Sequence, residues 1–282
     1  MQPGDEIYID ITHSFRSLSL FLFLTITFLR DLAHEKQIKI AGVYYGMLDV
    51  TRELGYTPVV DLKSLFDMTS WIKGAYSLQS YGDGYLIAEL LKSQNENQLA
   101  NQIEQLSQSL NINSVNDIKQ KSSTLRNSLQ TQVARTPFKY LKNILENFVR
   151  KFSRSSAQES QYQLELAGWY FDNHRYSTGY ITLAEAIITY LCEINSKDIR
   201  SETDRNEMKN FLHRPENRNS DLAQLYFDVN PIRKSIAHAL LPIRNSHDRG
   251  NDKGNLSNAI QNATNYQQMA KKIFSTGTLN QE

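Results

Sequence analysis

The side chains with the clearest chemical potential lie in residues 230–239, which read NPIRKSIAHA. Arg233 and His238 are separated by four residues, and they combine a permanent cation with a group that exchanges a proton near neutral pH. Such a pair could contact a group outside the domain, such as the phosphate of a ligand. The structural alternative is that both side chains are merely solvated.

A helix over about residues 231–246 is expected to carry this pair. Asn230 can cap it, and Pro231 suits the first helical position. Three apolar residues recur at helical spacing and predict a stripe that faces the core: Ile232, Ile236 and Leu240. At about 100° per residue, Arg233 and His238 then project away from that stripe. Arg233 would lie in the first turn, where unpaired N–H groups favour an anion such as a phosphate.

A second polar group occupies residues 10–16, which read DITHSFR and follow a β-rich run. Hydroxyl, imidazole and guanidinium groups beside a helix N-terminus could cradle a phosphate. In the alternative interpretation, Thr12 and Ser14 cap the helix and Asp10 satisfies backbone N–H groups.

Strand and helix patterns alternate in the first third of the chain. Three runs predict strands and one predicts a helix packed on them: residues 6–10, 38–45 and 57–62, and residues 14–34. A strand, a crossover helix and a second strand form a right-handed parallel unit, whose ligands lie at the carboxyl ends of the strands. The loops that start at Asp10 and Tyr45 are therefore the expected ligand site. Three strands make a thin sheet, so either a partner covers its edge or an N-terminal half is lacking.

Beyond about Ser64 only helical periodicity is visible. The predicted helices cover residues 123–152, 159–172, 176–194, 201–212, 231–246 and 256–274. Residues 93–121 are rich in Gln, Asn and Ser, and their weak apolar repeat predicts an exposed connecting helix and loop at the domain junction. Residues 81–84 predict a turn, and Trp71 and Trp169 predict core anchors.

Composition indicates the number of domains, the cellular compartment and the kinds of site that the chain can form. The 282 residues, 40% of them hydrophobic, suffice for two domains, and the net charge of +1 requires any nucleic-acid site to be local. Cys192 is the single cysteine, and no leader pattern opens the chain, so a cytoplasmic protein without an intrachain disulfide is expected. Residues 18–29 are too short a stretch to cross a membrane, for which about 20 residues are needed, and they are expected to form a buried helix. His174 and His213 lack companions at ligand spacing, so no metal site is expected.

The segment with Arg233 and His238, including the small Ala237 before the histidine, resembles the Arg-x4-His motif of HEPN ribonucleases. Residues 166–170 and 183–190 are similar to the first helices of HEPN domains in CRISPR-associated proteins. The resemblance implies metal-independent RNA cleavage, in which an arginine and a histidine from each of two subunits converge on the ribose 2′-hydroxyl. One motif per chain then implies a homodimer, and products that end in a 2′,3′-cyclic phosphate.

Residues 10–16 resemble the Asp-[Ile/Leu]-Thr-His-Gly segment of CARF domains, which sense cyclic oligoadenylate in type III CRISPR systems. Residues 45–46 and 58–61 resemble later elements of the same subfamily, and Ser14 stands where the family often has glycine. The resemblance implies that the messenger contacts Asp10, Thr12, His13, Ser14, Arg16, Tyr45 and Gly46. The family's first strand and loop, which supply the other wall of the pocket, have no counterpart here. The chain thus resembles a truncated member, or one half of a split sensor completed by a separate chain.

The expected architecture is a partial, parallel α/β Rossmann-like sheet of the CARF type in residues 1–92, connecting helices in residues 93–157, and an all-α HEPN domain in residues 158–282. The expected function is single-stranded RNA cleavage, catalysed by Arg233 and His238 without metal or cofactor and switched on by cyclic tetra-adenylate. Two rivals stay open. A truncated dimer could bind no messenger and leave its nuclease silent or unregulated, or the site around His13 could itself degrade the messenger.

Overall fold

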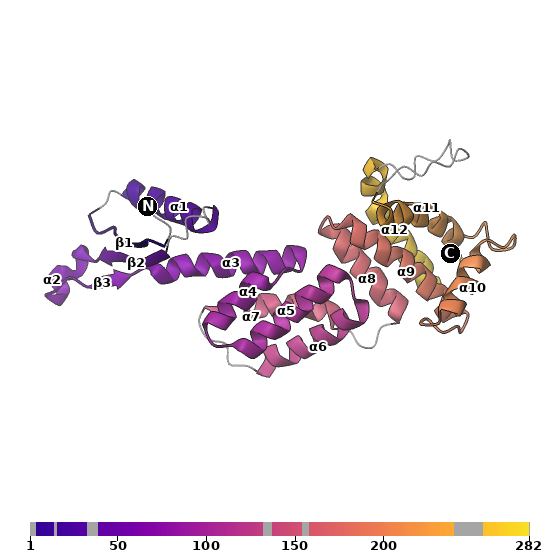
Figure 1. The fold of residues 1–282 in the computed structure, drawn as a ribbon, viewed down its shortest axis with the longest axis horizontal. Coiled ribbons are helices and arrows are strands. Elements are labelled where there is room, and N and C mark those ends of the chain that lie inside the picture. The colour runs from indigo at the N-terminus through magenta and orange to yellow at the C-terminus, as the bar shows by residue number, and fades with distance from the viewer. Residues whose placement is uncertain are drawn as a thin grey trace.

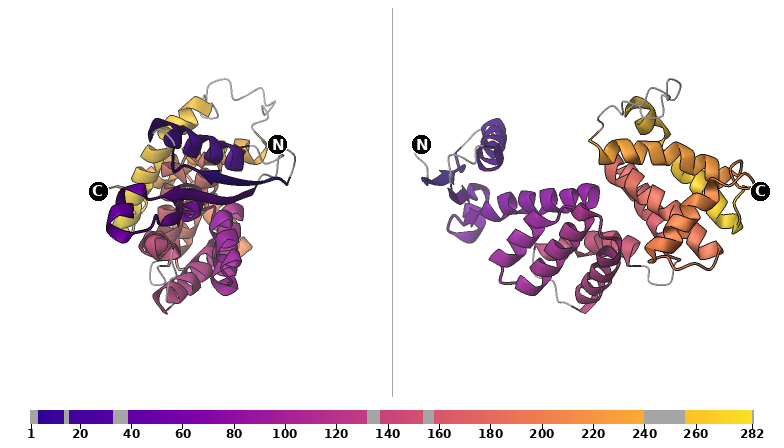
Figure 2. Two further views of the ribbon diagram at one scale, coloured as in Figure 1. Left: turned by 90° about the vertical axis from the view of Figure 1, so that its left-hand side faces the viewer. Right: turned by 45° about the vertical axis from the view of Figure 1, so that its right-hand side comes forward.

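The computed structural model describes residues 4–13, 16–32, 39–131, 137–153, 158–239 and 256–281. Helices dominate, and a small sheet lies at the N-terminal end (Figure 1). Buried apolar side chains form three groups: an N-terminal core around Val43, a middle core from Trp71 to Tyr170, and a C-terminal core from Leu164 to Ile273. These groups follow one another along the molecule, as the right-hand view of Figure 2 shows.

The sheet contains β1 (Glu6–Asp10), β2 (Lys39–Gly46) and β3 (Val59–Asp61), in that order. β1 and β2 are parallel, as the strand–helix–strand pattern predicts, but β3 is antiparallel to β2. The prediction of a parallel sheet is therefore wrong for the third strand. The link from β2 to β3 holds only η2 (Leu48–Val50) and the one-turn α2 (Thr51–Leu54), so it reverses direction beside the strand ends instead of crossing the sheet.

Helix α1 (Arg16–Leu32) packs on the sheet with one face only. Ile26 is buried with Val43 of β2 and with Phe66. The opposite face carries large apolar side chains that are each more than half exposed: Leu20, Phe21, Leu24 and Phe28. The expectation of a fully buried helix is thus wrong for this face, because apolar residues surround the helix and the sheet covers one side of it.

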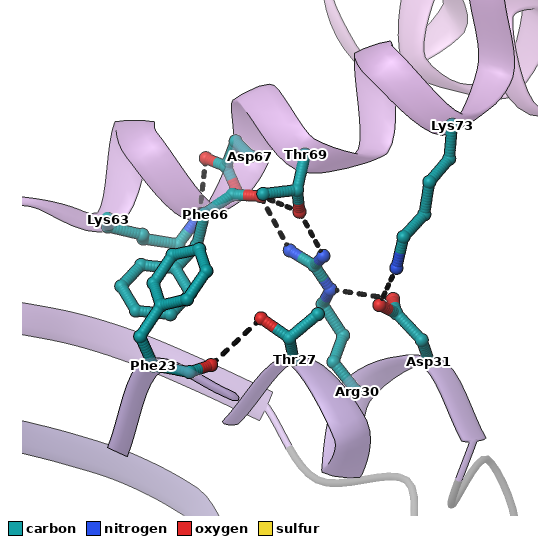
Figure 3. Close-up of polar contacts among 9 residues, drawn as sticks. All are labelled: Phe23, Thr27, Arg30, Asp31, Lys63, Phe66, Asp67, Thr69 and Lys73. Atoms are coloured by element: carbon teal, nitrogen blue, oxygen red, sulfur yellow. Dashed lines mark hydrogen bonds and ion pairs between the residues drawn. The ribbon is translucent and has the colours of Figure 1, made fainter. Parts of the chain in front are cut away.

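Helix α3 (Lys63–Tyr81) connects the sheet to the middle core, and Arg30 of α1 forms hydrogen bonds with α3 (Figure 3). Arg30 Nη1 donates to the Phe66 carbonyl oxygen at 2.7 Å, and Nη2 donates to Thr69 Oγ1 at 2.5 Å. Asp31 accepts from Arg30 Nε at 3.0 Å and also pairs with Lys73. The guanidinium is partly buried, and this desolvation lowers its pKa from the ordinary value. α1 and α3 are therefore joined by polar contacts as well as by packing.

The middle core contains α3, α4 (Tyr85–Ser93), α5 (Asn97–Ile112), α6 (Val115–Thr131), α7 (Phe138–Phe152) and part of α8 (Glu159–Asp172). The apolar repeat of α5 is at most 2% exposed: Leu99, Ile103, Leu106 and Leu110. This burial corrects the expectation of an exposed connector, because four regularly spaced apolar residues suffice to dock a helix whose other faces are polar. The single helix predicted for residues 123–152 is in fact two, α6 and α7.

The turn predicted at residues 81–84 joins α3 to α4. Gly82 ends α3 with a φ of +70°, and a side chain there would press on Leu110 and Trp169. The amide of Gly84 donates to Ser107 Oγ at 2.8 Å. Trp71 and Trp169 are 2% and 8% exposed within the middle core, which confirms their prediction as core anchors.

The C-terminal core contains α8, α9 (Tyr176–Ile194), α10 (Glu202–Leu212), α11 (Asp221–Ala237) and α12 (Leu256–Thr276). The bounds predicted for α8 and α9 are those observed. Two tyrosines of α9 are anchored to the far side of the core, since Tyr180 Oη donates to the Ala259 carbonyl oxygen at 2.6 Å and Tyr190 Oη to that of Thr278 at 2.8 Å. Among the helices described, none is both long and apolar enough to span a membrane.

Candidate functional site

The carboxyl ends of β1 and β2 lie side by side, because the two strands are parallel. Asp10 is in register with Tyr44, and the Ile11 amide donates to the Tyr44 carbonyl oxygen at 2.9 Å. The loops that start at Asp10 and Tyr45 therefore meet, as the sequence predicts. Tyr45 is half-buried and pairs with Val60 of β3.

Thr12 joins the two strand ends. Its amide and its hydroxyl both donate to Asp10 Oδ1, at 2.8 and 2.6 Å, and the hydroxyl oxygen accepts from the Gly46 amide at 2.8 Å. Gly46 is buried, and a Cβ atom there would lie 3.0 Å from Thr12 Cγ2. A side chain at position 46 would force Thr12 to shift by a few tenths of an ångström, so glycine favours the close approach of the two loops.

This network changes the role expected for Thr12. Its hydroxyl proton and its amide are committed to Asp10, so neither is available to a phosphate. Hydrogen bonds from Thr12, and then the nearby His13, lower the pKa of Asp10, which holds a carboxylate at this edge. The alternative interpretation, in which Asp10 satisfies local N–H groups, describes this geometry.

Without Thr12, fewer side chains of residues 10–16 can contact an anion. His13 is exposed. α1 begins at Arg16, so this residue stands in the first turn, where backbone N–H groups lack helical partners. Ser14 and the side chain of Arg16 lie outside the described residues.

Helix α11, which carries Arg233 and His238, begins well before Pro231. Ser220 is its N-cap, with a side chain that accepts from the Ala223 amide at 3.3 Å, and Pro231 lies inside the helix with its ring exposed. The predicted start at Asn230 is therefore wrong. The pair Asn-Pro imitates a helix start, but Leu222, Leu225 and Val229 extend the buried stripe through it.

Arg233 consequently lies near the C-terminal end of α11, and His238 is the C-cap with φ −96° and ψ 21°. The partial charge at this end of a helix is negative, which favours a cation and provides no N–H group for a phosphate. The predicted help from a helix N-terminus is thus absent at Arg233. Leu240, the third residue of the predicted stripe, lies outside the described residues.

On an ideal helix, positions 233 and 238 are about 140° apart. His238 is exposed, whereas Arg233 is half-buried. Its Nε atom is shielded from solvent and has no hydrogen-bond partner among the residues described. The prediction that both side chains project away from the core therefore fits His238 and does not fit Arg233.

The guanidinium of Arg233 acts on Tyr226, two turns earlier on the same helix. Burial raises the pKa of Tyr226, while Arg233 lowers it. Glu185 of α9 and Arg205 of α10 also act on this phenol, the first raising its pKa and the second lowering it. Arg233, Glu185 and Arg205 thus all act electrostatically on Tyr226, and we call these four residues the α11 cluster.

Arg205 is held firmly in the α11 cluster. Its Nη1 donates to Thr189 Oγ1 at 3.1 Å and to the Ile199 carbonyl oxygen at 3.0 Å, and its Nη2 pairs with Glu185. Sequence reasoning missed this cluster because its members come from three helices. One signal was available, since Tyr226 and Arg233 are seven residues apart and share a helix face, but it required the correct start of α11. In the described ranges, no three His, Cys, Asp or Glu side chains converge to hold a metal ion.

Comparison with known proteins gives two findings. Residues 67–160, which span most of the middle core, match the family model of the CRISPR-associated protein MJ1674, second domain. The CRISPR-associated protein MJ1674 of Methanocaldococcus jannaschii is 36% identical over 247 residues, which cover 85% of this chain and 38% of that protein. The chain therefore spans well under half the length of this relative. Both findings relate the chain to CRISPR-associated proteins.

Proposed function

Starting from the relation to a CRISPR-associated protein, we propose that this chain is an RNA endonuclease of CRISPR defence. It cuts single-stranded RNA without a metal ion, and cyclic tetra-adenylate bound at the strand ends activates it. The observation that carries the proposal is the exposed imidazole of His238 at the end of α11, five positions from the half-buried guanidinium of Arg233 whose Nε has no described partner. A proton-exchanging group and a partly desolvated cation are the two groups that phosphodiester cleavage by a ribose requires.

In the proposed reaction the ribose 2′-oxygen attacks the adjacent phosphorus, and the bond to the 5′-oxygen breaks. The 2′-hydroxyl loses its proton, the leaving 5′-oxygen gains one, and the RNA ends in a 2′,3′-cyclic phosphate. His238 moves a proton, and Arg233 stabilises the charge on the phosphorane oxygens. Because positions 233 and 238 are about 140° apart on an ideal helix, a second copy of the chain is needed to complete the set around one phosphate.

The proposed activation uses the connection from the sheet to the helices. β1 ends at Asp10, α1 begins six residues later at Arg16, and Arg30 joins α1 to α3 (Figure 3). α3 then enters the middle core, which packs against α8 of the C-terminal core. A ligand that repositions the start of α1 can therefore act on the nuclease through packed helices.

The contacts proposed for the messenger are those that the resemblance to CARF domains implies, without Thr12, whose hydroxyl and amide donate to Asp10. His13, Ser14 and Arg16 contact its phosphates, and Tyr45 and Gly46 form the neighbouring edge. Asp10 is a carboxylate, so it accepts from a donor of the ligand, such as a ribose hydroxyl.

Arg16→Ala is expected to weaken binding of cyclic tetra-adenylate by about 10- to 100-fold, because one charge-assisted contact to a phosphate is lost. The wild-type affinity should also fall as salt rises, since the guanidinium is a permanent charge. Calorimetry at low and moderate salt measures both effects. Arg52→Ala, which removes an exposed arginine from the neighbouring α2, is the matched control and should bind like the wild type. Binding that ignores Arg16 and salt would place the messenger elsewhere.

The proposed function is tested by incubating the full chain with a fluorescent single-stranded RNA in excess EDTA, with and without cyclic tetra-adenylate. Cleavage should occur in the chelator, because the proposed chemistry uses nitrogen donors of the protein and no metal-bound water. The messenger should increase the rate. If EDTA stops cleavage and magnesium restores it, the proposed chemistry is wrong.

A further inference from the structure

The outer face of α1 is apolar and exposed. Four large side chains are each more than half exposed there: Leu20, Phe21, Leu24 and Phe28. On an ideal helix these positions lie within about 100° of one another, so they form one stripe. The solvent face of a helix normally carries charged or polar side chains, but residues 18–29 contain no charged residue. A contiguous apolar face of this kind is typical of an interaction surface.

A second exposed stripe runs along α3. Leu65, Ile72 and Tyr76 are each more than half exposed. Their spacings of seven and four residues place them within about 40° of one another on an ideal helix. Trp71 and Leu78, on another side of α3, are buried in the middle core, so the stripe is apolar surface beyond what docks the helix.

The two stripes approach each other where α1 contacts α3. Asp31 lies one turn beyond Phe28 in α1, and its carboxylate pairs with Lys73 (Figure 3). Lys73 lies three residues before Tyr76 and therefore beside it on the surface of α3. We call the seven side chains of the two stripes the α1–α3 surface.

The α1–α3 surface is large enough for a protein interface. At roughly 100 Å² for each half-exposed large side chain, its seven side chains present on the order of 700 Å². The largest apolar patch of an ordinary monomer is about 300–600 Å², and a stable complex buries about 800 Å² on each partner. The surface therefore approaches the area that a stable dimer needs.

The chemistry of this surface allows it to pair with itself. In a contact about a two-fold axis both copies use the same patch, so a patch of one charge sign would repel its own copy. The seven side chains of the α1–α3 surface carry no charge. Apolar side chains of one copy can therefore pack between those of the other without an electrostatic cost.

The position of the surface also favours a second copy as its occupant. α1 and α11 lie on the same side of the molecule, which is the upper side in Figure 1 and in both views of Figure 2. A two-fold axis along this side would set α1 against its copy and, at the same time, α11 against its copy.

We propose that the α1–α3 surface binds a second copy of this chain, and that this contact brings the two copies of α11 together. The inference rests on the proposed function for the need of a second Arg233 and His238. The two exposed stripes are independent of that function.

Sedimentation velocity of the full chain tests the proposal. The wild type is expected at twice the chain mass of 32.5 kDa at micromolar concentration. A wild type that stays at 32.5 kDa up to about 100 µM would overturn the proposal.

Substitutions by glutamate locate the interface. Leu24→Glu in α1 and Ile72→Glu in α3 place a charge in the apolar contact, and the two-fold axis makes each change count twice. Each should weaken dimerisation at least about 100-fold while circular dichroism stays unchanged, because the replaced side chains are exposed in the single chain. Ile112→Glu makes the same chemical change at an exposed isoleucine at the end of α5, outside the surface, and should remain dimeric. A dimer that survives both surface substitutions would overturn the assignment.

Cysteine cross-linking tests the contact without adding a charge. Cys192 is the single cysteine and is buried, so a cysteine added to the surface supplies the exposed thiol. Cysteine is placed singly at residue 20, 24 or 28, and at least one variant is expected to form disulfide-linked dimers under mild oxidation. Ile112→Cys should form few. Linkage at none of the three positions, or equal linkage at position 112, would contradict the proposal.

Vesicles of a zwitterionic phospholipid test the other occupant that an apolar face could have. The dimeric wild type should stay in the supernatant when the vesicles are pelleted. A wild type that is monomeric alone and pellets with the vesicles, while Leu24→Glu does not, would overturn the proposal in favour of a membrane contact.

Two outcomes separate this inference from its premise. A dimer that is disrupted by Leu24→Glu but cuts no RNA supports the α1–α3 surface and refutes the proposed nuclease. RNA cleavage by a wild type that is monomeric does the reverse.

Discussion

Substituting His238 by alanine is expected to reduce the rate of RNA cleavage by about 10²- to 10⁴-fold, the contribution usual for a positioned general acid or base. The fold should not change, because the side chain is exposed at the C-cap of α11. Within the described ranges, the hydrogen bonds of His238 are those of its backbone amide, to the carbonyl oxygens of Ile236 and of Lys234, the latter at 3.1 Å. The measurement is single-turnover cleavage of a labelled single-stranded RNA with saturating cyclic tetra-adenylate, with circular dichroism of each variant.

His213 provides the matched control. It is also an exposed histidine at the C-cap of a helix of the same bundle, where its ring lies 4.9 Å from that of Phe227. His213→Ala should cut RNA within about threefold of the wild type, since surface substitutions away from a site have small effects. Cleavage that is equal in the wild type and in His238→Ala would remove His238 from the chemistry.

Arg233 calls for a different design, because it is half-buried and acts on Tyr226. Its removal would alter the α11 cluster as well as any contact with RNA. Arg233→Lys retains the charge and most of the volume but loses the planar fork of donors. Comparison of the lysine and alanine variants therefore separates the need for a charge from the need for a guanidinium.

Secondary structure could be predicted from the sequence where the apolar pattern and the residues at the ends of an element indicate the same bounds. The bounds of α8 and α9 are predicted correctly, because a dense apolar pattern is ended by short polar segments. The meeting of the loops at Asp10 and Tyr45 follows from a parallel strand pair. The start of α11 is predicted wrongly because Asn230 and Pro231 imitate a cap, although the buried stripe runs through them. The capping preference of Asn230 and Pro231 favours a helix start there, but the burial of the apolar stripe keeps the helix continuous through both residues.

Other features depend on contacts between distant segments. The direction of β3 depends on the path of residues 47–58, which turn back at the strand ends. Glu185 and Arg205 are ordinary charged residues in their own helices, and only packing brings them to Tyr226. The burial of α5 could be predicted only by giving its four leucine and isoleucine positions more weight than its polar composition.

The proposed nuclease mechanism depends most directly on the ribose 2′-oxygen acting as the nucleophile. If the 2′-oxygen is the nucleophile, a strand made of deoxyribonucleotides offers nothing to attack, and His238 and Arg233 are then without a substrate. A single ribonucleotide inserted in such a strand restores one nucleophile at one known position. The effect should approach all or none, because a metal-bound water that could attack any phosphate is not part of the proposed chemistry.

The decisive measurement is therefore mass spectrometry of the products from this single-ribose strand, with cyclic tetra-adenylate and EDTA present. Each of the four bases is placed at several positions around the ribose, so that recognition does not limit cutting. We expect one cut, directly 3′ of the ribose, with a 2′,3′-cyclic phosphate on one fragment and a 5′-hydroxyl on the other. Cuts at deoxyribonucleotides, or fragments that end in a 3′-hydroxyl and a 5′-phosphate, would contradict it.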